Sequence, residues 1–149
     1  MTSHSCKLCD EFNSKENIIK EFKHVFLMFN RYPYVPGHIM LVPKRAFSTL
    51  YQYSDEERTE IFDVMYQAQK LLMECLEVTS SNIGLNTGPN SGGSIPSHLH
   101  IHILPRCDND MNFMMTTTEN PIRFREHNDS ARKKILKSFN IYEFEKSNS

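Results

Sequence analysis

The sequence of 149 residues has few cysteines, no excess of one charge and no long hydrophobic run. Four cysteines, unevenly spaced, are too few for a secreted disulfide scaffold. The net charge of −1, from 17 basic and 18 acidic residues, argues against a surface that binds nucleic acid or anionic lipid. No window approaches the roughly 18 consecutive apolar residues of a membrane span, and the polar N-terminus lacks the apolar core of a secretion signal. We therefore expect a cytoplasmic protein whose partners include neither a membrane nor a nucleic acid.

The chain also lacks internal repeats, low-complexity tracts and linkers rich in proline, glycine or serine. Its length suits one domain with a hydrophobic core that needs no disulfide for stability. We predict a single domain over residues 1–149, with a core at about 6–115 and a polar C-terminal extension at 116–149.

Four short apolar segments predict strands, at residues 24–30, 38–42, 82–86 and 98–104. The first two are separated by a turn that contains Pro36 and Gly37, which favours an antiparallel hairpin. Short connections between most of the strands indicate an antiparallel sheet.

A long helix is predicted to begin after Ser54, which can form a capping box with Glu57 three residues later. Apolar residues then recur every three or four positions as far as Leu76, which places them on the face of the helix that packs against the sheet. A weaker, basic helix is predicted at 130–139. Together these elements predict an α+β fold in which one long helix covers one face of the sheet.

Three histidines stand at alternate positions in the last predicted strand: His98, His100 and His102. Alternate side chains of a strand share one face, so Leu99 and Ile101 should point into the core on the other. Imidazoles arranged in this way can bind a transition metal. Alternatively, one of them can act as nucleophile or general base while its neighbours hold an anion.

A glycine-rich loop at residues 88–94 directly precedes the histidines. The adjacent Gly92 and Gly93 let the backbone approach a ligand closely, and their amides with the Ser94 hydroxyl can form an anion-binding nest. Phosphate is the natural occupant. The combination of loop and histidines favours phosphoryl or nucleotidyl chemistry over metal storage.

A second constellation is the pair Cys6 and Cys9 at the N-terminus, a C-x-x-C motif. Alone it could be a redox pair, half of a zinc site or a chance occurrence. A reducing cytosol favours the zinc interpretation, and a structural zinc site needs about four ligands.

Several motifs together resemble the histidine triad (HIT) family. They are HLHIHIL at 98–104, NRYPYVPGH at 30–38, VPK at 42–44 and GGS at 92–94, and the resemblance covers about residues 6–115. It implies a HIT-like fold whose sheet continues across a homodimer.

The resemblance also implies a nucleotide hydrolase or transferase. The middle histidine, here His100, would attack the α-phosphate of a nucleotide and form a covalent nucleotidyl-histidine, which water, phosphate or another acceptor resolves. His102 would contact the phosphate or the leaving group, and His98 would orient the nucleophile or support the site. Preorganised amides and a protonated neighbour would stabilise the developing charge. Such catalysis needs no metal.

The substrate-binding residues implied by the resemblance lie in the same motifs. Asn30 falls at the ribose-hydroxyl position and Asn86 near the scissile phosphate, while Gly93 and Ser94 belong to the loop that holds it. The string GGSIPSHLHIHILPR, which contains Ser94, is similar to the branch with bacterial diadenosine tetraphosphate phosphorylases, and this favours a dinucleoside polyphosphate substrate. Two alternatives stay open: a nucleoside phosphoramidate hydrolase, and a zinc-containing nucleotide-binding or adaptor protein with little turnover.

Some members of the family complete a zinc site with the first histidine of the triad, which makes Cys6, Cys9 and His98 the candidate ligands here. A further ligand in those members follows the VPK segment, where this chain has Ala46. The missing ligand would then be His4, His24, Cys107 or water. Such a zinc ion would be structural and would tie the N-terminus to the catalytic sheet.

Overall fold

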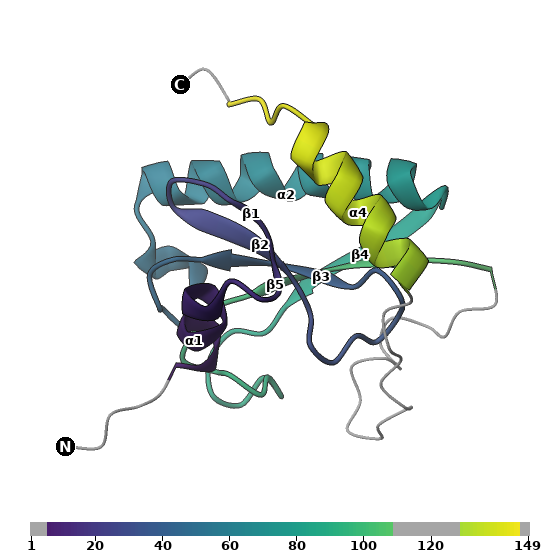
Figure 1. Cartoon of the computed structure of the whole chain (residues 1–149). Coiled ribbons are helices and arrows are strands. Elements are labelled where there is room, and N and C mark those ends of the chain that lie inside the picture. The colour runs from purple at the N-terminus through teal and green to yellow at the C-terminus, as the bar shows by residue number, and fades with distance from the viewer. Residues whose placement is uncertain (1–5, 109–128, 147–149) are drawn as a thin grey trace.

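The computed structural model describes residues 6–108 and 129–146, which form one antiparallel sheet with helices on both faces (Figure 1). The predicted α+β fold is confirmed. The elements in chain order are α1 (Lys7–Ser14), β1 (Ile18–Glu21), β2 (Val25–Phe29), β3 (Ile39–Pro43), a 3₁₀ turn η1 (Leu50–Gln52), α2 (Asp55–Leu76), β4 (Ser80–Leu85), β5 (Ile101–Arg106) and α4 (Asp129–Ile141). Residues 109–128, with the end of the predicted core and much of the predicted extension, lie outside the described part.

The sheet has five strands in the order β1-β2-β3-β5-β4, and every neighbouring pair is antiparallel. The predicted hairpin of β2 and β3 is present, with Leu27 opposite Leu41. The strand β5 lies between β3 and β4, so His102 stands opposite Met40 of β3 and Gly84 of β4. A histidine of the predicted triad thus lies inside the sheet, with a strand on either side.

The two faces of the sheet are covered by different helices. On what we call the core face, alternate residues of β2 such as Val25 and Leu27 join a large apolar cluster with α2 and α4. On the opposite side, the pocket face, Phe26 and Met28 join a smaller cluster with Leu8 of α1. Burial on both faces explains why β2 is a continuous apolar run rather than an alternating one.

The helix α2 begins where the sequence predicts. The Ser54 hydroxyl accepts a hydrogen bond from the Glu57 amide at 3.2 Å, and the Ser54 amide donates to the Glu57 carboxylate at 2.8 Å. The same carboxylate accepts two hydrogen bonds from Arg45, at 2.7 and 3.0 Å. Both features fix the start of the helix, whose Ile61, Val64, Ala68, Leu71 and Leu72 are buried.

Two elements and one strand boundary differ from the prediction, and one predicted turn depends on its glycine. The sequence predicts neither α1 nor β1, and β5 begins at Ile101 rather than at His98. Gly37, in the turn between β2 and β3, has a φ of +89°, and a Cβ atom there would lie 2.7 Å from Leu76 Cδ1. The turn therefore requires glycine.

Among the described helices, none is both long and apolar enough to cross a membrane.

Candidate active site

A cavity of about 640 Å³ opens on the pocket face of the sheet. One wall is formed by α1, the loop after β4 forms another, and Met28 and Met40 contribute from the strands beneath. Six residues that the sequence predicts for substrate binding or catalysis line this cavity: Asn30, Asn86, Gly93, Ser94, His100 and His102. The structure thus brings together segments that lie as far apart in the chain as Asn30 and His102.

His98 does not line the cavity, although it belongs to the same histidine motif. Leu99, Ile101 and Ile103 point into the core-face cluster, as the alternation predicts. His98 is 1% exposed and its ring lies against Cys6 and Cys9, so the three histidines share one face but divide between two sites.

The His100 ring has a defined tautomer. Its Nδ1 lies 2.8 Å from the backbone carbonyl oxygen of His98, and because a carbonyl can only accept, Nδ1 carries the proton. The other ring nitrogen, Nε2, is then the unprotonated one and has a free lone pair. His100 is only 6% exposed and lines the cavity, so this lone pair belongs to a nearly buried ring with little freedom to turn away.

The His102 tautomer is set by a chain of hydrogen bonds that passes through His38. The Tyr34 amide donates to His38 Nδ1 at 3.1 Å, which leaves the proton of a neutral His38 ring on Nε2. That nitrogen lies 2.8 Å from His102 Nδ1 and donates to it. His102 therefore carries its own proton on Nε2 and can donate a hydrogen bond while neutral.

His102 is neutral at pH 7 in this structure. Burial, together with the nearby His100, lowers the pKa of His102 to about 3. The resemblance implied a protonated neighbour, whereas His102 would act here as a neutral donor, because the surrounding protein removes hydration that an imidazolium needs. The Nε2–H group can still stabilise negative charge as a hydrogen-bond donor.

The loop that precedes the histidines packs closely against Asn86. A Cβ atom at Gly93 would lie 3.1 Å from the Asn86 Cβ and 3.4 Å from its amide nitrogen. The glycine therefore allows the loop backbone to approach Asn86, and Gly92 has a φ of +83°. The arrangement places the loop backbone and the Ser94 side chain at the rim of the cavity that contains His100.

Asn30, at the end of β2, is held by several contacts. Its side-chain oxygen accepts a hydrogen bond from the Tyr32 amide at 2.9 Å, and its amide nitrogen donates to Met40 Sδ at 3.5 Å. Asn30 and His102 line the cavity, and the fully buried His38 lies within 3.2 Å of Asn30 Nδ2 and 2.8 Å of His102 Nδ1.

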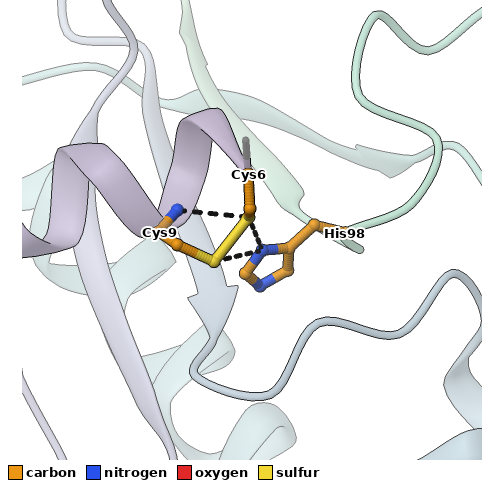
Figure 2. Close-up of side chains that lie close together, drawn as sticks. All are labelled: Cys6, Cys9 and His98. Carbon is orange, nitrogen blue, oxygen red and sulfur yellow. Dashed lines mark hydrogen bonds between the residues drawn. A yellow bond between two sulfur atoms is a disulfide. The ribbon is translucent and has the colours of Figure 1, made fainter. Parts of the chain in front are cut away.

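A second cluster lies at the start of α1, where Cys6, Cys9 and His98 meet (Figure 2). Their ligand atoms all lie within 4.8 Å of one another, and His98 Nδ1 is 3.0 Å from Cys6 Sγ and 3.8 Å from Cys9 Sγ. The two cysteines are joined as a disulfide in this structure. His98 Nε2 donates to the Pro43 carbonyl oxygen at 2.7 Å, so Nδ1 is unprotonated and points its lone pair toward the sulfurs.

Two residues considered as a fourth metal ligand do not join this cluster. His24 Nε2 lies 3.3 Å from a Glu56 carboxylate oxygen, and the exposed Cys107 follows β5. Within residues 6–108 and 129–146, the metal-ligating group consists of Cys6, Cys9 and His98 alone. His4 lies outside the described residues.

Sequence reasoning missed a buried residue that supports the cavity, His38, and two groups that line it. His38 was part of a quoted motif but was given no role, and its contact with His102 joins residues 64 positions apart. The side chains of α1, among them Leu8 and Glu11, form a wall that no sequence pattern indicated. Met28 and Met40 looked like ordinary core residues, which they also are.

Comparisons with known proteins identify the family. The HIT domain model matches residues 11–109, and the chain belongs to that family. It is 37% identical over 97 residues to an AP-4-A phosphorylase of Mycobacterium tuberculosis, which covers 65% of this chain and 50% of the relative. It is 34% identical over 77 residues to the asymmetrical bis(5'-nucleosyl)-tetraphosphatase of Schizosaccharomyces pombe, which covers 52% of this chain and 42% of the relative.

The chain thus spans about half the length of the curated relatives it matches. Among solved structures, a Zn-bound histidine triad family protein from Mycobacterium smegmatis superposes with a TM-score of 0.72 at 19% identity. That match covers 91% of this chain and 94% of the other. At this identity the likeness shows the shared fold.

Proposed function

We propose that this protein cleaves the α-phosphate of a dinucleoside polyphosphate, similar to diadenosine tetraphosphate, through a covalent nucleotide on His100. The observation that carries the proposal is the hydrogen bond from His100 Nδ1 to the His98 carbonyl, which leaves Nε2 unprotonated in a ring that lines the cavity. The names of the relatives, a phosphorylase and a tetraphosphatase, support the same substrate class.

In the first step, His100 Nε2 forms a bond to the α-phosphorus while the bond from phosphorus to the bridging oxygen breaks. The leaving group departs as a nucleoside polyphosphate. In the second step, an oxygen of water or inorganic phosphate attacks the phosphorus and displaces His100. The bond between phosphorus and Nε2 breaks, which restores the Nε2 lone pair. His100 keeps its proton on Nδ1 throughout, and the His98 carbonyl stabilises the positive charge that develops on the ring.

Several groups would stabilise negative charge at the phosphorus. His102 Nε2–H donates from one side, and the loop amides with Ser94 donate from another. Asn30 would hold the ribose, and Asn86 would stand near the scissile phosphate. Lys7 and Arg31 also line the cavity, and they would attract a polyphosphate, although Arg31 is paired with Glu11 at 3.1 Å.

The donor set at the start of α1 fits a structural zinc ion when the two cysteines are reduced. Two thiolates and one unprotonated imidazole nitrogen are typical zinc ligands, and the bond from His98 Nε2 to the Pro43 carbonyl orients the ring for that role. Bound there, zinc would supply cross-linking of α1 to the sheet. The proposed reaction needs no cofactor.

A homodimer with a continuous sheet is part of the same proposal. The strand β4 is an edge of the sheet, and the neighbouring face of α2 exposes large apolar side chains. Phe62 is 67% exposed and Tyr66 is 49% exposed, one helical turn apart. An edge strand beside exposed aromatic residues is typical of a surface that a second copy covers.

The test is a chromatographic assay with diadenosine tetraphosphate and with an adenosine phosphoramidate, each with and without inorganic phosphate. Intact-protein mass spectrometry of quenched samples looks for a nucleotidyl adduct in the wild type and in His100→Asn. Phosphate-dependent formation of ADP and ATP indicates a phosphorylase, and phosphate-independent release of AMP indicates a hydrolase. An adduct that persists in His100→Asn contradicts the proposed nucleophile.

The two alternatives give different results in the same assay. Turnover of the phosphoramidate alone would favour the phosphoramidate hydrolase. Tight nucleotide binding with no turnover and no adduct would favour a nucleotide-binding protein. Sedimentation of the wild type and of Phe62→Asp tests the dimer, because a buried aspartate would dissociate it.

A further inference from the structure

The pair Cys6 and Cys9 can exist in two forms that exclude each other. In this structure the sulfurs are bonded to one another beside His98 (Figure 2). The reduced pair would offer two thiolates to a metal together with His98 Nδ1. The sulfurs of a disulfide carry no negative charge and bind zinc poorly, so one cluster of atoms supports either a disulfide or a metal site.

We infer that Cys6 and Cys9 form a redox modification site. The reduced pair holds Zn²⁺ with His98, and a two-electron oxidant such as a peroxide converts the pair to a disulfide and releases the metal. The neighbouring sulfurs show that the two cysteines can reach one another without any change in α1. This inference concerns a site separate from the proposed reaction at His100.

The chemistry balances with a peroxide as oxidant. One thiolate attacks a peroxide oxygen, the O–O bond breaks, and a sulfenic acid forms with hydroxide as leaving group. The second thiolate then attacks the sulfenic sulfur and displaces a second hydroxide. In sum, two thiolates, one hydrogen peroxide and two protons give one disulfide and two waters. The sulfurs lose two electrons and the peroxide oxygens gain them, and a dithiol reductant reverses the change by exchange.

The local structure favours reaction at this pair over Cys75, and the pair alone has a second thiol within reach to close a disulfide. Cys6 is the N-cap of α1, and its sulfur accepts a hydrogen bond from the Cys9 amide at 3.3 Å, which holds the two residues in one turn. Both residues are half-buried and open to a small oxidant. By contrast, burial raises the pKa of Cys75 on α2, which keeps that thiol protonated and unreactive.

The site is connected to the cavity in two ways. The helix α1 begins directly after Cys6, and its Lys7, Leu8 and Glu11 line the cavity. His98 carries the metal-facing nitrogen and also the carbonyl that holds His100. Loss of the metal would untie α1 from the sheet, so oxidation should weaken nucleotide binding. This last consequence rests on the proposed function.

The test uses the full chain with Cys75→Ser and Cys107→Ser, so that Cys6 and Cys9 are the only thiols. The reduced, zinc-loaded protein is titrated with hydrogen peroxide. Released zinc is measured with a chromogenic chelator, the disulfide by intact mass as the loss of two hydrogens, and AMP affinity by calorimetry. A Cys9→Ser variant of the same background is the matched control, because it cannot form the disulfide.

We expect zinc release in proportion to disulfide formation, reversal by a dithiol with added zinc, and AMP affinity at least about fivefold weaker after oxidation. Cys9→Ser should show no disulfide and no reversible loss of AMP affinity. Failure of the reduced protein to bind zinc, or zinc retention in the disulfide form, would overturn the inference. Equal AMP affinity in both forms would overturn the stated effect of oxidation on nucleotide binding. Absence of AMP binding in either form would instead contradict the proposed function, while zinc release and mass would still report on the redox site.

Discussion

The core face and the pocket face are built from alternate residues of the same strands, yet they use polar groups differently. On the core face, Leu27, Leu41 and Ile101 pack against α2 and α4, and the cluster contains the Tyr53 side chain, whose hydroxyl is hydrogen-bonded on both sides. On the pocket face, His102 occupies the position opposite Met40 in the same register. The core face therefore depends on the shape and volume of its apolar side chains, whereas the pocket face depends on which histidine nitrogens carry protons.

The difference teaches that two neighbouring residues can be essential for unrelated reasons. Leu99 and His100 are adjacent and nearly buried, at 1% and 6% exposure. Leu99 belongs to the core-face cluster and His100 lines the cavity. Substitution of Leu99 should therefore affect mainly stability, whereas substitution of His100 should affect mainly catalysis.

The largest effect is expected for His100→Ala. Removal of the proposed nucleophile should lower kcat by about 10⁴-fold or more. The free energy of unfolding should change by no more than about 1.5 kcal/mol, because only one hydrogen bond, to the His98 carbonyl, is lost. Steady-state kinetics and urea denaturation check both numbers. Near-normal turnover would remove His100 from the mechanism.

Leu99→Ala should give the opposite pattern. A cavity opened in the core-face cluster should lower the free energy of unfolding by about 2–5 kcal/mol. Turnover per folded molecule should stay within a few-fold of the wild type, measured well below the melting temperature. If Leu99→Ala abolished kcat while leaving stability unchanged, the assignment of the two faces would be wrong.

The sequence predicted the core face better than the pocket face, for a physical reason. Apolar periodicity reports burial, so β2, β3, α2 and the alternation of 98–103 could be predicted from the residues. The helix α1 has eight residues with only Leu8 buried, and β1 has four residues with a bulge, so neither carries a clear periodic signal.

The candidate site depended on contacts that no local pattern contains. Cys6 and His98 are 92 positions apart, and the family resemblance rather than the spacing suggested that they meet. The resemblance likewise supplied the positions of Asn30 and Asn86, which the cavity brings together. The lowered pKa of His102 arises from burial and from the nearby His100, and its tautomer arises from the contact with His38. Both appear only in the folded chain.

The two faces should also differ in how stability depends on pH. The pKa of His102 falls from an ordinary value of 6.5 to about 3 on folding, because burial disfavours the charged ring. The unfolded chain therefore binds a proton first as the solution is acidified. This contribution to stability is complete above pH 6.5 and is lost progressively down to about pH 3.

Tyr53 on the core face should act at the opposite end of the pH range. Burial raises its pKa from 10 to about 12, so the unfolded chain loses its phenolic proton first. Stability should fall between pH 10 and 12, by at most about 3 kcal/mol. Urea denaturation across pH checks both arms, with His102→Asn and Tyr53→Phe as controls. His102→Asn should reduce only the loss of stability at low pH, and Tyr53→Phe only the loss at high pH. An unchanged dependence of stability on pH in either variant would contradict the stated cause.

The smallest expected effect compares the ends of α2 and α1, one helix from each face. Each ends in a non-glycine residue with a left-handed backbone: Glu77 has a φ of 56° and Lys15 a φ of 59°. Glycine adopts this conformation without steric cost, so Glu77→Gly should raise the free energy of unfolding by about 0.5–1 kcal/mol.

Lys15→Gly should raise the free energy of unfolding by less than Glu77→Gly, because the substitution also removes side-chain contacts of Lys15. Its ammonium lies 3.4 Å from the centre of the Phe12 ring and 3.0 Å from a Glu21 carboxylate oxygen, whereas the Glu77 carboxylate has an exposed contact with Lys134 at 3.7 Å. Such exposed contacts contribute up to about 1 kcal/mol each, which offsets the backbone gain at Lys15. Urea midpoints of the two variants decide the matter. If Lys15→Gly were the more stabilising change, the Lys15 contacts would contribute nothing, and α1 would be held by other contacts such as those of Leu8, Phe12 and Glu11.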